Sequence, residues 1–333
     1  MAVLGVQNPT MLDVVNRMDP NGSIAVVSEI LNETNEMLQD MTMMEGNLPT
    51  GHRSTVRTGI PEPTFRRLYG GVQPTKSTTA QITDSTAMLE AFAEIDVALA
   101  DLNGNTSEFR LSEDRAHIEG MSQAVAEATI FGDETVNPER FTGLAPRFND
   151  LSAANADNII PGGSVDTDNA SIWLVGWGPN TVHGIYPKGS TAGLAMEDLG
   201  KVTIENQDGN GGRMRAYRTH YRWDVGLSVR DWRYVVRIPN IDRSLLNADA
   251  SGSSANLNDL MFEAMERIPN LSSARFGWYM DRSIVTKLRQ QTAAGVTNSM
   301  LTTDQIGGVS VTSFNGVPLR RVDTLATDEA LVT

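Results

Sequence analysis

The chain has 333 residues, more than one hydrophobic core usually serves, so two domains or one elaborated domain is expected. Its 40% hydrophobic and 20% charged residues are typical of a folded soluble protein, and no apolar run approaches the ~18 residues needed to span a bilayer. The lack of cysteine excludes disulfides, thiolate nucleophiles and cysteine metal sites, and a net charge of −14 argues against a protein whose main task is to bind nucleic acid.

The first 46 residues are predicted to form an arm that carries one helix. The start "MAVLGVQNPTMLDVV" lacks the basic beginning and apolar centre of a secretory signal, so we expect synthesis in a cytoplasm. After the turn at residues 19–22, Ser23 can cap a helix whose apolar positions recur at helical spacing as far as Met41. The rest of this helix is acidic, so it should lie on something larger.

Residues 47–80 are predicted to form a long extended hairpin. This segment contains four prolines and the pair Gly70-Gly71, and it has too few apolar residues for a core of its own. Alternation in "STVRTGI" and "TFRRLYGGV" indicates two extended arms. A loop of this length is improbable inside a compact domain unless it is functional or reaches a partner, so we expect it to lie on another subunit.

A long helix is predicted from about residue 106 to 131, with a strand before it. Alternation of apolar and polar residues over 89–99 indicates a strand that returns from the hairpin, although its alanines leave a helix as an alternative. After "NGNTS" the apolar positions change to helical spacing and form one stripe. The stripe consists of Leu111, Ile118, Met121, Val125 and Thr129.

The stretch "FGDETVNPERFTGL", residues 131–144, indicates how this helix ends. Gly132 is placed to stop the helix, and Pro138 prevents it from resuming. Phe141 and Leu144 are expected to anchor the chain in a core again.

Residues 145–310 are predicted to form a larger, β-rich region. "SIWLVGWG" and "VHGIY" look like strands, and "KVTIENQDGNGGRMRAYRTHYRWDV" indicates a hairpin around residues 208–212. Helices are predicted over 257–268 and from a cap at Asp281. A final hairpin is predicted where "VSVTSFNGVPLRRVDTL" alternates on both sides of the turn Asn315-Gly316.

Charge lies in blocks of alternating sign along the chain. Residues 23–45 carry five acids and no base, and residues 84–119 carry nine acids and two bases. Residues 50–79 have five bases and one acid, and residues 213–237 have seven arginines and two aspartates. Such blocks let copies of one chain attract each other. Folding by itself could also mix them, so charge alone leaves both interpretations open.

A search for catalytic, cofactor and metal motifs finds none. The histidines have no partner at metal-ligand spacing, and there is no nucleophile elbow, phosphate-binding loop or dinucleotide fingerprint. "DGNGG" at residues 208–212 lacks the carboxylates of a calcium loop. We therefore expect no enzyme activity, no cofactor and no metal site. The four histidines are His52, His117, His183 and His220.

The arginines of residues 213–237 alternate with aromatic residues and are the best nucleic-acid candidate in the chain. Aromatic side chains beside cations are what single-strand binding uses. The alternative, which the acidic net charge favours, is that arginines and aromatics occupy opposite faces of one strand and the arginines pair with acids of a neighbouring subunit.

The order of these elements resembles the major capsid proteins of tailed bacteriophages, double-stranded DNA phages of the podovirus type. The hairpin segment "PEPTFRRLYGGVQPTKSTTAQITDS" with its return "IDVALADL", the turn "FGDETVNPERFTGL", the late helix "YMDRSIVTKL" and the strands of "FNGVPLRRVDTL" carry the resemblance. It implies an α+β fold of five segments. They are an N-terminal arm (1–46), an extended loop hairpin (47–85), a peripheral domain with a long spine helix (86–145), an apical domain with a central sheet (146–308) and return strands of the peripheral domain (309–333). The resemblance also implies that Gly132, Pro138, Phe141 and Gly143 mark a junction between domains.

The resemblance implies a structural protein that assembles into hexamers and pentamers of an icosahedral shell around packaged double-stranded DNA. The basic loop would lie on an acidic part of the adjacent subunit. The residues expected in this contact are Arg53, Arg57, Arg66, Arg67 and Lys76 on the loop, and Asp101, Glu108, Glu113 and Asp114 on the other side. The expected location is the virion capsid, assembled in the cytoplasm of a host bacterium.

The resemblance also implies partners. A separate scaffolding protein is expected, because the hairpin begins within about fifty residues of the N-terminus. A portal protein, a cement or decoration protein, and DNA bound without sequence specificity are further expected partners, and no membrane is. Some family members crosslink subunits through a loop lysine, for which Lys76 is the one candidate. The alternatives are a compartment shell of the same fold that holds cargo enzymes, a nucleic-acid-binding module, and an unrecognised hydrolase.

Overall fold

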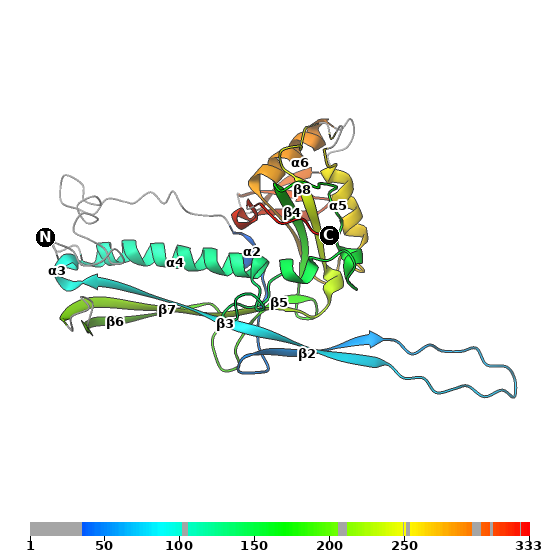
Figure 1. The fold of residues 1–333 in the computed structure, drawn as a ribbon, viewed down its shortest axis with the longest axis horizontal. Helices are drawn as coiled ribbons and strands as arrows, with labels where there is room; N and C mark the ends of the chain where they lie inside the picture. Colours follow the sequence, from blue (N-terminus) through cyan, green and yellow to red (C-terminus); the bar gives the residue numbers. More distant parts are fainter. Residues whose placement is uncertain are drawn as a thin grey trace. The chain divides into compact units, whose positions relative to one another are not determined.

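The computed structural model describes residues 35–101, 106–205, 212–248, 250, 254–294, 301–306, 309–326 and 328–333. These residues form a mixed fold of long strands and helices (Figure 1). None of the helices described is long and apolar enough to cross a membrane. The helix predicted from Ser23 lies mostly outside the described residues, and only the short helix α2 (Met37–Asp40) corresponds to it.

The described residues belong to two compact units. Unit 1 contains residues of Met88–Val125 and Gly193–Asp224, and unit 2 contains residues of Thr34–Ala87, Ala126–Ala192 and Val225–Thr333. The boundaries between the units fall inside three long elements, which are β3 (Thr78–Asp96), α4 (Thr106–Phe131) and β7 (Arg213–Val229). These boundaries differ from those of the five segments expected from the sequence, and the five-segment division stays a prediction.

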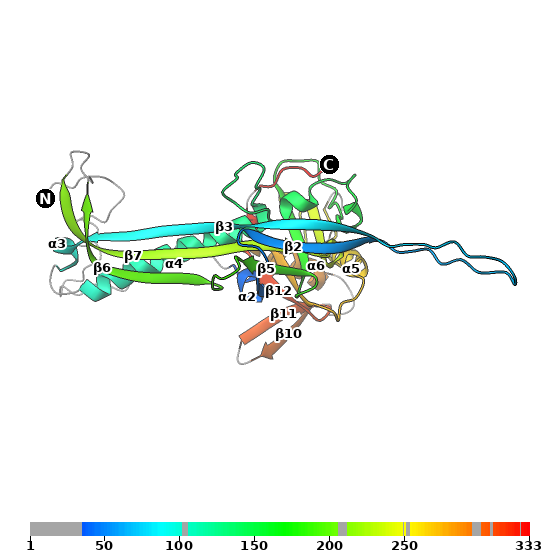
Figure 2. The same ribbon diagram turned by 90° about the horizontal axis from the view of Figure 1, so that it is seen from below.

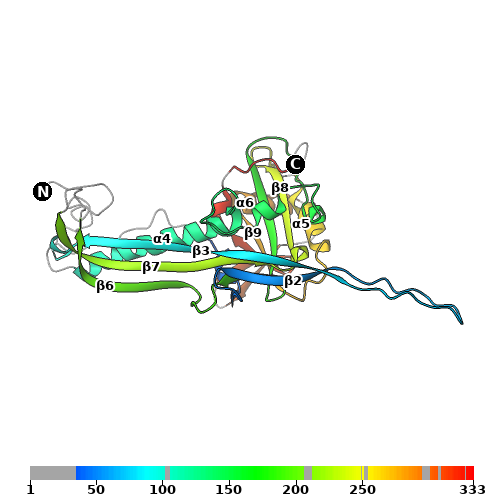
Figure 3. The ribbon, with the colours of Figure 1, turned by 60° about the horizontal axis from the view of Figure 1, so that its bottom comes forward.

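Unit 1 is built on the pair of strands β6 (Leu194–Glu205) and β7. They run antiparallel, from Leu194 opposite Trp223 to Glu205 opposite Arg213, as expected for the hairpin predicted around residues 208–212. The strand predicted over 89–99 is the end of β3, which is next to β7 in the order of hydrogen-bonded strands (Figure 3). It ends at Asp96, whose carboxylate caps the short helix α3 (Val97–Ala100), so the last residues of that prediction are helical.

Helix α4 confirms the predicted helix over 106–131, but its apolar stripe is only partly buried. Met121, Val125 and Thr129 are buried as expected. Leu111 and Ile118 are 53% and 39% exposed in the single chain. At its first turns, α4 instead buries Phe109 against Ile95 and Ala100. The side of a straight helix that contacts a curved or twisted neighbour changes along the helix. A single stripe of apolar residues therefore does not predict which residues are buried over the whole length of α4.

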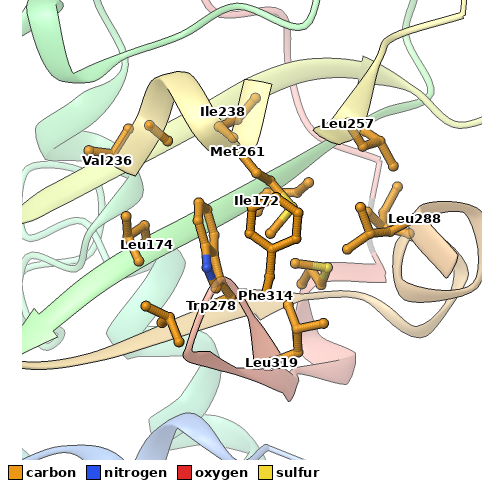
Figure 4. Packing of buried hydrophobic residues seen from close by; sticks show 14 of the residues in the cluster. Ile172, Leu174, Val236, Ile238, Leu257, Met261, Trp278, Leu288, Phe314 and Leu319 are labelled. Atoms are coloured by element: carbon orange, nitrogen blue, oxygen red, sulfur yellow. The ribbon is translucent and has the colours of Figure 1, made fainter. Parts of the chain in front are cut away.

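The core of unit 2 is a sheet centred on β4 (Asn169–Trp177). β4 is fully buried, because it pairs antiparallel with β8 (Val235–Asp242) on one side and with β9 (Arg275–Met280) on the other. Helices α5 (Leu257–Glu266) and α6 (Arg282–Ala294) add their apolar faces, so that Met261 and Leu288 pack with Trp278 and Phe314 (Figure 4). The predicted cap at Asp281 is confirmed, since its carboxylate accepts the Ser283 N–H at 2.8 Å.

The remaining strands of unit 2 extend this sheet. β12 (Val317–Arg321) lies parallel on β9, followed by β11 (Val309–Phe314) and β10 (Leu301–Ile306) (Figure 2). The predicted turn at Asn315-Gly316 is confirmed by positive φ angles of 47° and 83°, which suit this pair. On the other side, β5 (Val182–Tyr186) pairs with the end of β7, and β1 (Met43–Glu45) runs parallel on β5.

The extended hairpin predicted over 47–80 is part of unit 2. β2 (Gly51–Gly59) runs antiparallel to the first part of β3, from Gly51 opposite Ser85 to Gly59 opposite Thr78. Residues 60–77 connect these strands without regular structure and continue beyond them in the same direction (Figure 1). We call residues 60–77 the extended loop.

Candidate assembly interface

Apolar side chains of the extended loop are open to solvent in the single chain. Phe65 and Tyr69 are 108% and 103% exposed relative to a reference side chain, and Leu68 and Ile60 are 87% and 83% exposed. Tyr69 has a φ of 63° in the turn that Gly70 closes with a 3.1 Å hydrogen bond to Arg67 O. An aromatic residue rarely adopts this backbone conformation without a reason. Contiguous exposed apolar side chains of this kind mark an interaction surface.

The five basic residues predicted on this hairpin are also exposed. Arg53 donates from Nε to the Thr83 hydroxyl at 3.2 Å, which aligns it along the strand pair. None of the five has an ion-pair partner among the residues that the structure describes. Their positive charge is therefore open to an acidic partner from another molecule. The five are Arg53, Arg57, Arg66, Arg67 and Lys76.

The base of the hairpin is held by a buried carboxylate. Asp84 is 3% exposed, and its two oxygens accept Arg147 Nη2 at 2.8 Å and Ser228 Oγ at 2.7 Å. Next to it, Ser85 donates to Glu134 at 2.6 Å. The close approach of strands β2 and β3 also needs Gly51, because a Cβ there would lie 2.1 Å from Asp84 O. The open loop thus extends from a fixed base within unit 2.

A pair of histidines lies close to this base. His183 is fully buried, and its ring meets that of His52 edge to face with centroids 5.7 Å apart. Burial lowers the pKa of His183 to about 4, with further lowering by His52 and Arg230 and opposition from Asp84. His183 is therefore neutral at pH 7.

The four acids predicted as partners of the loop lie in unit 1, where Asp101 and Asp114 accept hydrogen bonds. Asp101 accepts hydrogen bonds from Thr106 at 2.9 Å, Tyr217 at 3.0 Å and Lys201 at 3.3 Å. The bond from Thr106 contributes most to lowering the pKa of Asp101. Asp114 accepts a hydrogen bond from the Tyr221 hydroxyl. Glu108 is exposed and Glu113 is half-buried.

The turn after α4 places the predicted junction residues. Gly143 N–H bonds to Gly132 O at 2.8 Å and Leu144 N–H to Thr129 O at 3.0 Å, so the returning chain satisfies carbonyl groups at the helix end. Phe141 and Leu144 are buried, and Pro138 is exposed. The turn lies wholly within unit 2, since the boundary with unit 1 follows Val125. The role of Gly132, Pro138, Phe141 and Gly143 as a domain junction stays a prediction.

Most arginines of residues 213–237 have acidic partners in their own chain. Arg218 pairs with Glu94 at 2.5 Å and Arg237 with Glu329 at 2.6 Å. This corrects the expectation that the acids come from a neighbouring subunit, because these arginines pair with acids of their own unit, either nearby in sequence or on another element. Because most arginines of residues 213–237 are already paired with acids, this segment gives little support to a nucleic-acid-binding module. The paired arginines are Arg213, Arg218, Arg222, Arg233 and Arg237.

Two buried anchors could not be found from the sequence. One is Asp84, and the other is Asp40 in α2, which accepts hydrogen bonds from Arg275 at 2.6 Å, from Arg320 at 2.9 Å and from the Tyr279 hydroxyl at 3.1 Å. The partners of both carboxylates are far away in the chain, by as much as 280 residues for Asp40. No local pattern distinguishes them from the surface acids around them.

Comparison with known proteins identifies this arrangement. The sequence family described as major capsid protein GP7 matches residues 19–333. The structure of bacteriophage Epsilon15 contains a chain 38% identical to this one, with 100% of each chain covered and a TM-score of 0.77. No curated protein sequence matches this chain.

More distant capsids have weaker similarity. The capsid of bacteriophage JBD30 is 10% identical, with 90% of this chain and 96% of that chain covered and a TM-score of 0.48. The capsid of the native GTA particle is 12% identical, with 67% and 95% covered and a TM-score of 0.47.

Proposed function

This chain belongs to the major capsid protein GP7 family, and we propose that its copies form the hexamers and pentamers of an icosahedral shell that encloses packaged double-stranded DNA. As a major capsid protein of a tailed phage it is a structural component of the virion, and it assembles with copies of itself. The extended loop is the observation that carries the proposal. A long loop that exposes apolar and basic side chains from a fixed base is typical of a surface that binds another molecule.

The loop of one copy lies on an acidic surface of the next copy. Strand β2 contributes Arg53 and Arg57, and the extended loop contributes Arg66, Arg67 and Lys76. The receiving surface contributes Asp101, Glu108, Glu113 and Asp114. Asp101 and Asp114 already accept hydrogen bonds within their own chain, so a basic side chain of the next copy would be an additional donor to them. Glu108 is exposed. Each exposed ion pair contributes only about 0–1 kcal/mol, so affinity comes from the whole contact, including Phe65 and Leu68.

Other partners follow from the same role. A separate scaffolding protein, a portal protein and a cement or decoration protein bind the shell, and assembly takes place in the cytoplasm of the host bacterium. The chain has no enzyme activity and needs no cofactor in this role. Its net charge of −14 suits contact with DNA that is weak and without sequence specificity.

The test is electron microscopy of purified protein, alone and together with its scaffold. We expect closed shells or rings of five and six copies. Replacing residues 62–75 by a short glycine turn leaves the pairing of β2 with β3 intact and should abolish closure. Shells of normal yield from this variant, or a monomer under every condition for the wild type, would contradict the proposal.

A further inference from the structure

Three carboxylates gather where β4 begins and β8 ends in unit 2. Asp166 and Asp168 precede β4, and Asp242 is the last residue of β8. One oxygen from each of the three lies within 4.8 Å of the others. Asp166 is exposed, Asp168 is half-buried and Asp242 is buried, so the cluster opens to solvent on one side.

Two buried oxygen atoms of Asp242 and Asn169 have no hydrogen-bond partner among the residues that the structure describes. They are Oδ2 of Asp242, which is 7% exposed, and Oδ1 of Asn169, which is 0% exposed. Asn169 is directly opposite Asp242 in the β4–β8 pair, so both side chains lie on the same face. The Asn169 amide Nδ2 donates to Asp166 O at 2.6 Å, which directs this amide group toward the aspartates. Buried oxygens without a donor are rare and call for an explanation such as a bound ion.

The other oxygen of each carboxylate is fixed by N–H donors. Oδ1 of Asp242 accepts from the N–H groups of Ser244 and Leu245, both at 2.9 Å. Oδ2 of Asp168 accepts from Ser244 N–H at 3.1 Å, and Oδ1 of Asp166 accepts from Thr167 N–H at 2.8 Å. Each carboxylate is thereby oriented and keeps its second oxygen available. Ligands held in this way by outer hydrogen bonds are typical of metal sites.

Arg243 is adjacent to Asp242 in sequence, and its guanidinium pairs with Asp328 at 3.1 Å. Three carboxylates so close together concentrate negative charge, which attracts a divalent cation.

We propose that Asp166, Asp168, Asn169 and Asp242 form a binding site for Ca²⁺. The four side chains offer only oxygen atoms, which excludes a preference for zinc or copper. Oxygen atoms that lie within 4.8 Å of one another can share one hard cation, and a site built from several protein oxygens suits Ca²⁺, whereas Mg²⁺ prefers to keep its water. The proposal revises the sequence-based expectation of no metal site, and it does not depend on the assembly role.

The bound ion would join the segment before β4 to the end of β8. Next to this point, Asn169 O accepts the N–H of Glu329 at 3.0 Å, so the C-terminal segment is attached to the same strand end. Binding to the folded state alone stabilises that state by mass action. Unit 2 should therefore unfold at a higher temperature in Ca²⁺.

The test uses the full-length protein, stripped with EGTA and titrated with CaCl₂ by calorimetry, with thermal unfolding measured in EGTA and in CaCl₂. We expect one Ca²⁺ per chain with a Kd between about 10⁻⁵ and 10⁻³ M and a higher unfolding temperature in CaCl₂. MgCl₂ at equal concentration should give a smaller shift. Failure of the wild type to bind Ca²⁺ stoichiometrically overturns the proposal whatever any variant does, and an equal response to Mg²⁺ overturns its assignment to calcium.

A matched pair of variants locates the site. Asp166→Asn/Asp168→Asn removes two of the three negative charges of the site and should weaken Ca²⁺ binding by more than about 100-fold, beyond what loss of an outer-shell partner costs. Asp150→Asn/Asp157→Asn removes the same charge from exposed positions of unit 2 and should bind like the wild type. An equal loss of Ca²⁺ affinity in both variants would mean that binding depends only on the overall negative charge of the protein, and this result would refute the site. Should the first pair unfold, Asp242→Asn, which keeps Oδ1 as an acceptor, replaces it.

Discussion

Gly143 makes close contacts with three backbone carbonyl groups in the turn after α4. A Cβ built on it would lie 2.6 Å from Ala128 O, 2.8 Å from Thr129 O and 2.9 Å from Ile130 O, and none of these backbone atoms can move without breaking the helix end. We expect Gly143→Ala to lower the free energy of unfolding by about 2–4 kcal/mol, as steric strain in a core does. The measurement is thermal or denaturant unfolding of the unassembled protein.

Gly71 provides the control for this substitution. It lies in the same unit, and no atom lies within 4 Å of a Cβ added there. Gly71→Ala should leave the free energy of unfolding within about 1 kcal/mol of the wild type, with any change toward higher stability. If the two alanine variants unfold alike, the close contacts of Gly143 do not govern the turn.

His183 makes the stability of unit 2 depend on pH in the acid range. The unfolded chain takes up a proton on this residue near pH 6.5, but burial keeps the folded chain from doing so until about pH 4. The stabilisation is therefore complete above pH 6.5 and is lost as pH falls from about 6.5 to 4. The loss is about 3 kcal/mol in total, since one pKa unit corresponds to about 1.4 kcal/mol.

His183→Phe isolates this contribution. The variant keeps a ring against His52 but has no group to protonate. Because other groups also titrate, the informative quantity is the difference between wild type and variant in unfolding free energy across pH 4 to 7. We expect the wild type to lose more stability on acidification, and parallel pH profiles would refute a role for His183.

At the scale of elements, substitutions in the hairpin of β2 and β3 can change assembly without changing the stability of the folded chain. Its base is fixed by Asp84, while Phe65 and Leu68 in the extended loop touch nothing that would hold them in the single chain. Phe65→Ser/Leu68→Ser should therefore change the free energy of unfolding by no more than about 0.5 kcal/mol, as surface substitutions do. The yield of closed shells in electron microscopy should fall sharply, because the proposed assembly buries these side chains between copies.

The control for the loop variant carries the same chemical change elsewhere in unit 2. Val136 and Leu271 are 72% and 41% exposed and lie outside the loop. Val136→Ser/Leu271→Ser should assemble normally. Normal shells from the loop variant would show that apolar contacts of the loop are dispensable.

At the scale of the whole molecule, contacts between residues far apart in sequence hold the C-terminal segment in place. Glu329 and Arg237 form an ion pair in which both side chains are about 5% exposed or less, and Ser171 donates to the same carboxylate. Glu329→Gln would leave the Arg237 charge buried without its counterpart. We expect a loss of about 3–5 kcal/mol in unfolding free energy, which chemical denaturation would measure.

The neighbouring residue Asp328 serves as the comparison. It pairs with Arg243 at 3.1 Å, but its side chain is 66% exposed. Asp328→Asn removes the same charge and should cost about 0–1 kcal/mol, because water screens the pair. Equal effects of the two substitutions would mean that burial of the Arg237 pair has no energetic weight.

The sequence alone determined the elements whose cause is local. Period-two alternation predicted the β6–β7 and β11–β12 hairpins, helical spacing predicted α4, and the pair Asn315-Gly316 fitted the positive φ angles of its turn. Proline and the shortage of apolar residues predicted the extended loop. These signals follow from backbone geometry and from the number of apolar groups available for burial, both of which a short window of sequence contains.

Only the tertiary structure decided which charges are paired. The arginines of β7 meet acids of their own chain, Asp84 and Asp40 are buried among partners up to 280 residues away, and Leu111 of the predicted stripe is exposed. The aspartates before β4 gather with Asp242 only because β4 pairs with β8. Such pairings depend on which segments the fold brings together, and periodicity holds no information about that. The sequence thus determined the elements and the family resemblance, whereas long-range packing determined which side chains are left to bind an ion or another copy.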